Sequence, residues 1–179
     1  MIIALKRDGV VYMGYDTFAS FDGVSHRMSA KENSKIMKKD NGAIVGAAGL
    51  IELNNALRSV DWLCIKDGVL EYDKLLVDLI CKFKGQRKLV ESAELIIAYK
   101  DKLFLFRGGV DLFELDDFVI SSGTGEMLAF SYLQSSQETD PEKLIIGAFN
   151  YASERLTCVG NSLMLINTRD LEFKEAKKC

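Results

Sequence analysis

The sequence predicts an α+β fold, a four-layer αββα sandwich in which two mainly antiparallel sheets pack face to face beneath outer helices. A group of strand-like segments opens the chain, two helix-like segments follow, and a second strand group, a second helix pair and a last strand complete the order. Two strand groups separated by helices are typical of two sheets with helices on their outer faces. Several strand segments are apolar on both sides, which fits sheets that are buried on both faces.

The opening strands form a hairpin. Residues 2–5 and 10–15 are β-branched, aromatic or otherwise apolar, and the Asp8-Gly9 pair between them is the signature of a tight turn. A more polar stretch over 16–31 leads to a short strand at 35–38. After a turn at 40–42, small and branched residues over 43–48 predict a close-packed strand.

The middle of the chain changes to a helical period. Apolar residues over 50–63 and again over 72–84 recur every three or four positions, so we expect a helix in each window. Strand patterns then return at 95–99, 103–106 and 118–120.

The last third of the chain carries the second helix pair. An apolar stripe over 125–133 predicts one helix, and Pro141 after Asp140 marks the start of another that runs to about residue 155. Residues 162–166 read as a closing strand, and the lysine-rich tail after them is polar enough to lie on the surface.

Composition limits the class of protein. A chain of 179 residues with 48% apolar residues is large enough for one domain, so we expect a single domain over 1–179. The net charge of -3 argues against nucleic acid and anionic membranes as partners, and favours protein or small molecules. No apolar run approaches the ~20 residues of a membrane span, and the opening residues reverse the order of a secretory signal, so we expect a cytoplasmic protein.

Metal and cofactor motifs are missing from the sequence. Cys64, Cys81, Cys158 and Cys179 form no C-x-x-C pair, and we expect free thiols without zinc or a redox role. His26, the single histidine, lies in a polar stretch that we interpret as a surface loop. The sequence therefore predicts no metal and no cofactor.

Several segments, taken in order, resemble the proteasome β-subunit group, and most closely the bacterial peptidase that works beneath an ATP-driven unfoldase ring. They are residues 2–6 with Val10-Val11 and Asp16, the pair Lys35-Ile36, the strand ending in Ala47-Ala48-Gly49, the turn over 121–125, and the closing strand over 162–166. The resemblance covers most of the chain. It implies a homo-oligomer that forms a ring through shared apolar helix faces, and an unfoldase or other protein as partner.

The resemblance also implies site residues. Members of this family are N-terminal nucleophile hydrolases, in which a threonine at the start of the first strand attacks the peptide carbonyl and its own α-amine takes the proton. By motif position, Asp16 and Lys35 would control protonation, Gly49 would give an oxyanion N–H, and Ser122 would stand near the nucleophile. Glu154 is the nearest candidate for a further acidic residue, although the segment around it lacks the family's aspartate and serine-glycine-glycine.

The first strand departs from this family pattern. When Asp16 is aligned without a gap, Met1 falls one residue after the position of the family's threonine. Removal of Met1 would expose Ile2, which has no nucleophilic atom, and we expect no propeptide that would uncover a threonine. The first threonine, Thr17, follows the second strand.

Three functions are therefore open. The leading hypothesis is a proteasome-like protein without threonine peptidase activity that acts through assembly or binding. The second is an active peptidase that uses an N-terminal or substitute nucleophile, for which Ser122, Thr17 and Cys158 are candidates and the Met1 α-amine a possible base. The third is a small-molecule binding or regulatory α/β domain. Each site residue also has a plain structural interpretation, since Asp16 can cap a turn and Gly49 can serve a strand-to-helix turn.

Overall fold

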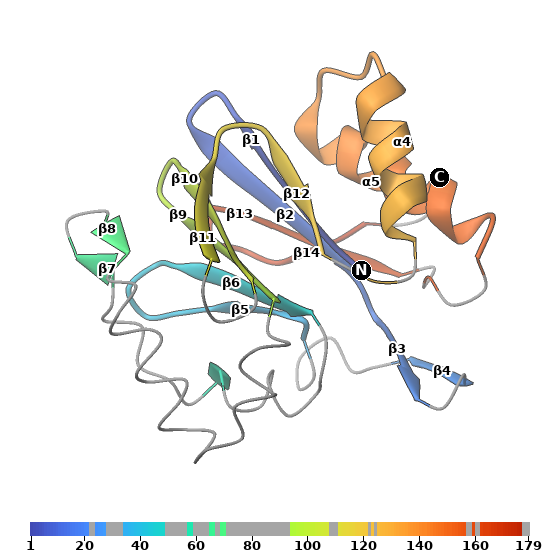
Figure 1. Ribbon diagram of the computed structural model, residues 1–179, viewed down its shortest axis with the longest axis horizontal. Coiled ribbons are helices and arrows are strands. Elements are labelled where there is room, and N and C mark those ends of the chain that lie inside the picture. Colours follow the sequence, from blue (N-terminus) through green and yellow to red (C-terminus); the bar gives the residue numbers. More distant parts are fainter. Residues whose placement is uncertain are drawn as a thin grey trace.

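Two five-stranded antiparallel sheets and two helices make up most of the described fold in a computed structural model of the chain (Figure 1). The structure describes residues 1–21, 24–27, 34–48, 57–58, 65–66, 69–70, 94–107, 111–121, 123, 125–156, 159 and 162–176. The sheets face each other across a common apolar core, as the sequence predicted for the αββα sandwich.

The first sheet has the strand order β12-β1-β2-β13-β14. Its strands are β1 (Ile2–Arg7), β2 (Val10–Asp16), β12 (Phe118–Ile120), β13 (Leu163–Asn167) and β14 (Lys174–Ala176). The second sheet has the order β11-β10-β9-β6-β5. Its strands are β5 (Ile36–Lys38), β6 (Ile44–Ala48), β9 (Glu94–Tyr99), β10 (Lys102–Arg107) and β11 (Asp111–Leu115).

The predicted opening hairpin is present. β1 and β2 pair antiparallel from Ile2↔Tyr15 to Arg7↔Val10, which leaves a two-residue turn. Both turn residues have positive φ, 51° at Asp8 and 70° at Gly9, as the twist of a tight hairpin requires.

Both predicted C-terminal helices are also present, and they cover the outer face of the first sheet (Figure 1). They are α4 (Glu126–Ser135) and α5 (Pro141–Ser153). Asp140 accepts a hydrogen bond from Lys143 N and caps α5, whose first residue is the proline. The helices predicted over 50–63 and 72–84 lie outside the described residues, apart from Leu57 and Arg58.

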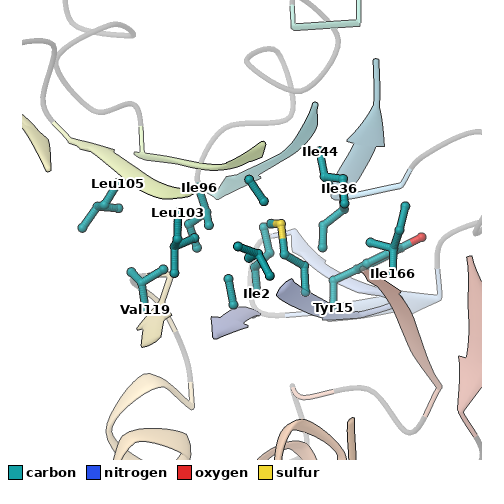
Figure 2. Close-up of a cluster of buried hydrophobic side chains, with 13 residues drawn as sticks. Ile2, Tyr15, Ile36, Ile44, Ile96, Leu103, Leu105, Val119 and Ile166 are labelled. Atoms are coloured by element: carbon teal, nitrogen blue, oxygen red, sulfur yellow. The ribbon is translucent and has the colours of Figure 1, made fainter. Parts of the chain in front are cut away.

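Two apolar clusters lie on opposite faces of the first sheet. The inter-sheet core, shown in Figure 2, consists of Ile2, Ala4, Val11, Met13, Tyr15, Ile36, Ile44, Ile96, Ala98, Leu103, Leu105, Val119 and Ile166. The helix–sheet core consists of Ile3, Leu5, Ile120, Ala129, Leu133, Leu144, Ile145, Ala148, Phe149, Ala152, Val159, Leu163 and Leu165. Successive residues of β1 thus alternate between the two cores, as side chains of a strand must.

The structure contains strands that the sequence analysis did not predict. The lysine-rich tail forms β14, which pairs with β13 at Leu163↔Ala176, and β11 pairs with β10 at the edge of the second sheet. Two short hairpins join β3 (Phe18–Phe21) to β4 (Val24–Arg27) and β7 (Ile65–Lys66) to β8 (Val69–Leu70).

The prediction of a loop at His26 is wrong. His26 lies in β4, where it pairs with Ala19 of β3. Backbone pairing in a two-stranded ribbon overrides a polar sequence pattern, because ladder hydrogen bonds do not depend on apolar side chains. No helix within the described ranges is long and apolar enough to cross a membrane.

Candidate active site

A buried carboxylate joins the two sheets at one end of the sandwich. The α-amine nitrogen of Met1 lies 2.5 Å from Asp16 Oδ1, and Lys35 Nζ lies 2.8 Å from the same oxygen. The side chain of Asp16 is 2% exposed and that of Lys35 is 15% exposed. We call Asp16, Lys35 and the Met1 α-amine the charged cluster. The structure thus brings together Asp16 and Lys35, two of the four site residues that the resemblance implied.

Strand pairing places each member of the charged cluster. Because Ile2 pairs with Tyr15 at the open end of the hairpin, Met1 lies opposite Asp16, whose N donates to Met1 O over 3.4 Å. Lys35 immediately precedes β5 in the other sheet, and its carbonyl oxygen accepts a hydrogen bond from Ala47 N. The lysine therefore reaches Asp16 from the opposite sheet.

Burial and the two cations set the protonation of the cluster. Burial by itself raises the pKa of Asp16, but the positive charges of the Met1 amine and Lys35 outweigh it and hold this pKa below its usual range. Burial, together with the charge of Lys35, lowers the pKa of the Met1 amine from 8.0 to about 5. Below pH 5 the amine therefore carries the charge that helps to lower the Asp16 pKa, whereas at neutral pH it is uncharged and able to accept a proton, and Lys35 balances the Asp16 carboxylate.

A serine hydroxyl lies beside the start of β1. Ser121 Oγ accepts a hydrogen bond from Ile2 N over 2.8 Å, and Ser121 N donates to Ile2 O over 2.9 Å. The side chain is buried, and Ser121 directly follows β12. The sequence predicted a role for Ser122, which lies outside the described residues, and did not single out Ser121. The pairing of β1 with β12, which places Ile3 opposite Ile120, brings Ser121 beside Ile2.

The other predicted site residues lie elsewhere or are not described. Gly49, Ser122 and Cys158 fall outside the described residues, so their roles stay predictions. Thr17 is buried, and its hydroxyl donates to Ser162 O over 3.4 Å on the β13 side. Glu154 ends α5 at the surface, where its carboxylate lies 3.5 Å from Arg155.

The side chain of Met1 points away from the charged cluster. It packs against the helix–sheet core, and its sulfur would lie 3.4 Å from a Cβ added to Gly125, where Val159 is also close. A thioether has no proton to lose and is only a weak hydrogen-bond acceptor. The cluster can therefore move protons and hold a charge, but Met1 gives it no hydroxyl or thiol.

Metal ligands do not gather in this site. Within the part of the chain that the structure describes, no group of three or more His, Cys, Asp and Glu side chains could hold a metal ion.

Comparison with solved structures shows the fold. BPH from Thiobacillus denitrificans, solved in complex with epoxomicin, superposes with a TM-score of 0.66 at 15% identity over 96% of this chain and 100% of that one. A second structure of the same protein superposes with a TM-score of 0.66 at 16% identity, over 96% of this chain and 99% of that one. Eukaryotic HslV from Trypanosoma brucei superposes with a TM-score of 0.63 at 15% identity, over 93% of this chain and 97% of that one. No protein-family model and no curated protein sequence matches the chain. The chain is thus similar in fold, over nearly its whole length, to HslV-type proteasome-like peptidases.

Proposed function

We propose that this chain is a subunit of a proteasome-like homo-oligomer that has the N-terminal nucleophile hydrolase fold without threonine peptidase activity. It acts through assembly or by binding a protein partner, for which an ATP-driven unfoldase is the candidate that the resemblance implies. The proposal rests on one observation, namely that the residue opposite Asp16 is a methionine whose side chain turns toward the helices.

The chemistry of the charged cluster supports this proposal. A peptidase of this type needs a base, a nucleophile and a group that keeps both correctly protonated. Asp16, Lys35 and the neutral amine provide the first and third of these, but acyl transfer needs an oxygen or sulfur that can bond to the carbonyl carbon. The methionine side chain does not provide one.

The exposed face of α4 supports assembly. Residues 127–137 carry no charged side chain, although 27% of the chain is charged. On this helix Met127 is 72% exposed and Phe130 is 44% exposed. The hydroxyls of Ser131 and Ser135 donate hydrogen bonds to carbonyl oxygens of their own helix, so these donors do not need water as a partner. An uncharged, partly apolar helix face of this kind fits contact with another subunit better than contact with water.

Peptide hydrolysis tests the proposed inactivity. The purified chain, its first residue established by intact mass, is incubated with fluorogenic peptides and with casein beside a Lys35→Ala control. We expect the same rate for both proteins, because the charged cluster has no nucleophile to activate. A rate for the unaltered chain well above that of the control would refute the proposal. Light scattering in the same buffer tests the homo-oligomer, and a strict monomer would contradict it.

One observation favours the alternative of an active peptidase with a substitute nucleophile. Ser121 Oγ lies next to the backbone of Ile2, the residue that follows Met1, and the Met1 amine has a pKa of about 5 and is unprotonated at neutral pH. The hydroxyl, however, is buried and already accepts a hydrogen bond from Ile2 N.

Covalent labelling separates the two functions. The chain is treated with a β-lactone, a vinyl sulfone and epoxomicin, the last because BPH has been solved with it. Peptide mapping by mass spectrometry then locates any adduct. We expect no modified residue, whereas a labelled Ser121, Ser122, Thr17 or Cys158 that is lost in Lys35→Ala would establish the alternative.

A further inference from the structure

A cavity of about 130 Å³ lies at the turn end of the β1–β2 hairpin, away from the charged cluster at the open end. The end of β1, the start of β12, the last turn of α4 and the first turn of α5 line it. No member of the charged cluster is among the lining residues. The cavity is therefore separate from the candidate active site.

The wall of this cavity is apolar. Leu5, Leu133 and Leu144 line it, and all three are buried members of the helix–sheet core. Phe118, which is partly buried against the same core, also lines it. Because a cavity of similar size lined by apolar side chains takes up benzene, this one has room for an apolar group of about six carbons.

An arginine stands at the rim of the cavity. Ile3 and Leu5 lie in the helix–sheet core, and Arg7 is the next residue on that face of β1. Arg7 lines the cavity and is exposed. Its side chain forms no hydrogen bond or ion pair with the residues that the structure describes. A guanidinium in this situation can bind a carboxylate through two parallel hydrogen bonds.

The nearby acidic residues leave this positive charge unpaired. Asp116 Oδ1 lies 3.0 Å from Lys6 Nζ, so this carboxylate already has a cation. The ladder between β1 and β12 continues to Asp117, whose O accepts a hydrogen bond from Lys6 N over 2.8 Å. Alternation then places the Asp117 side chain on the face of Val119, which lies in the inter-sheet core. The charge available to a ligand in the cavity is therefore that of Arg7.

We propose that this cavity binds a small monocarboxylate with a compact apolar body, such as benzoate or isocaproate. The carboxylate pairs with the guanidinium of Arg7, and the apolar body displaces water from the leucine wall. Gln134, which also lines the cavity, adds a neutral amide donor. The inference goes beyond the proposed function and does not depend on whether the chain hydrolyses peptides.

Leucine-methyl NMR of the full chain, titrated with benzoate, tests the proposal. We expect saturable shifts for Leu5, Leu133 and Leu144 and none for Leu103, which is buried in the inter-sheet core. Benzamide keeps the ring but lacks the charge, so it should bind at least about tenfold more weakly than benzoate. Acetate lacks the ring and should cause no saturable shift, because the apolar contacts are lost.

Two arginine variants assign the role of the charge. Arg7→Gln removes the guanidinium from an exposed position, so it should weaken benzoate binding at least about tenfold and leave benzamide binding unchanged. Arg169→Gln, at an exposed arginine outside the cavity, is the matched control and should bind benzoate as the unaltered chain does. Thermal unfolding of both variants verifies that they fold.

The other outcomes overturn the proposal. Equal binding of benzoate and benzamide to the unaltered chain, or benzoate binding that survives Arg7→Gln, would show that the charge of Arg7 does not select the ligand. Shifts of Leu103 as large as those of the lining leucines would place the binding elsewhere. No shift up to the solubility of benzoate would show that the cavity does not take such acids. Peptide hydrolysis by the chain would refute the proposed function and leave this inference unchanged.

Discussion

The two ends of the β1–β2 hairpin each carry a lysine–aspartate pair, and the pairs differ in their exposure to water. At the turn end, Lys6 Nζ lies 3.0 Å from Asp116 Oδ1, and the aspartate side chain is 93% exposed. At the open end, Lys35 Nζ lies 2.8 Å from Asp16 Oδ1, and that side chain is 2% exposed. The nitrogen–oxygen distances are nearly equal, so the distances alone do not rank the pairs.

Burial ranks them. Water screens the exposed pair, and such pairs contribute about 0 to 1 kcal/mol to stability. The buried pair has lost its hydration, so each member depends on the other and on the Met1 amine. The open end of the hairpin is therefore where a change of charge should cost the protein most.

Removal of each aspartate gives the largest contrast. Asp16→Ala should lower the free energy of unfolding by about 3 kcal/mol, because it leaves Lys35 without its buried partner. Asp116→Ala, the matched control, should lower it by less than about 1 kcal/mol. Urea unfolding followed by circular dichroism measures both, and equal losses would contradict the ranking by burial.

Two glycines of the same hairpin, one at the turn and one in β2, differ in how closely other side chains pack against them. A Cβ on Gly14 would lie 2.6 Å from Ile145 Cγ2 and 2.9 Å from Leu165 Cδ2, so Gly14→Ala should cost about 2 kcal/mol. Gly9 has no neighbour within 4 Å of such a Cβ, and Gly9→Ala should cost only about 1 kcal/mol, from its φ of +70°. Thermal unfolding of the two variants measures the difference, and a larger loss for Gly9→Ala would count against the close contact of α5 with β2.

The pH dependence of stability tests the buried amine. The pKa of the Met1 amine is about 5 in the folded chain and 8.0 for an ordinary chain terminus, so between these pH values the unfolded chain binds the extra proton. Stability should therefore rise from pH 5 to pH 8, by at most about 1.4 kcal/mol per pH unit. The lowered pKa of Asp16 adds a further loss of stability as the pH falls below about 4. Urea unfolding at a series of pH values measures the slope, and a flat profile would show that the amine is not buried.

Replacement of each lysine, Lys35 or Lys6, gives the smallest expected effect, which is a change in the pKa of the Met1 amine. Lys35→Met should raise the pKa of the Met1 amine above about 5 but leave it below 8.0, because it removes a nearby positive charge while burial persists. Lys6→Met at the other end of the hairpin should leave that pKa unchanged. Reductive methylation with a ¹³C label, followed by NMR across pH, reports the amine directly, and a shift in Lys6→Met would contradict a local origin.

Much of the architecture was predictable because its signals are local. Asp8-Gly9 marked the first turn, Asp140-Pro141 marked the start of α5, and runs of branched residues marked β6, β9 and β10. The strand β14 gave no such signal, because its side chains are mostly exposed and only its backbone pairs with β13. The four-residue strand around His26 was missed because its sequence is polar and the pairing of its backbone with β3 leaves no local signal.

The members of the charged cluster were predictable in part. Asp16 and Lys35 were identified through a family resemblance, and their contact depends on the packing of one sheet on the other. The position of Ser121 beside Ile2 depends on how β12 pairs with β1, which is a contact over 119 residues of sequence. Such long-range pairing is not encoded in any local period.

By itself the sequence determined that Met1 lies opposite Asp16. The two-residue turn at Asp8-Gly9 sets the register of the opening hairpin, and this turn is a local feature of the sequence. Only the tertiary structure decided that the side chain of this methionine faces the helices while its nitrogen joins Asp16 and Lys35. The physical reason is that a strand has two faces, and which of them meets the second sheet is settled by how the layers pack.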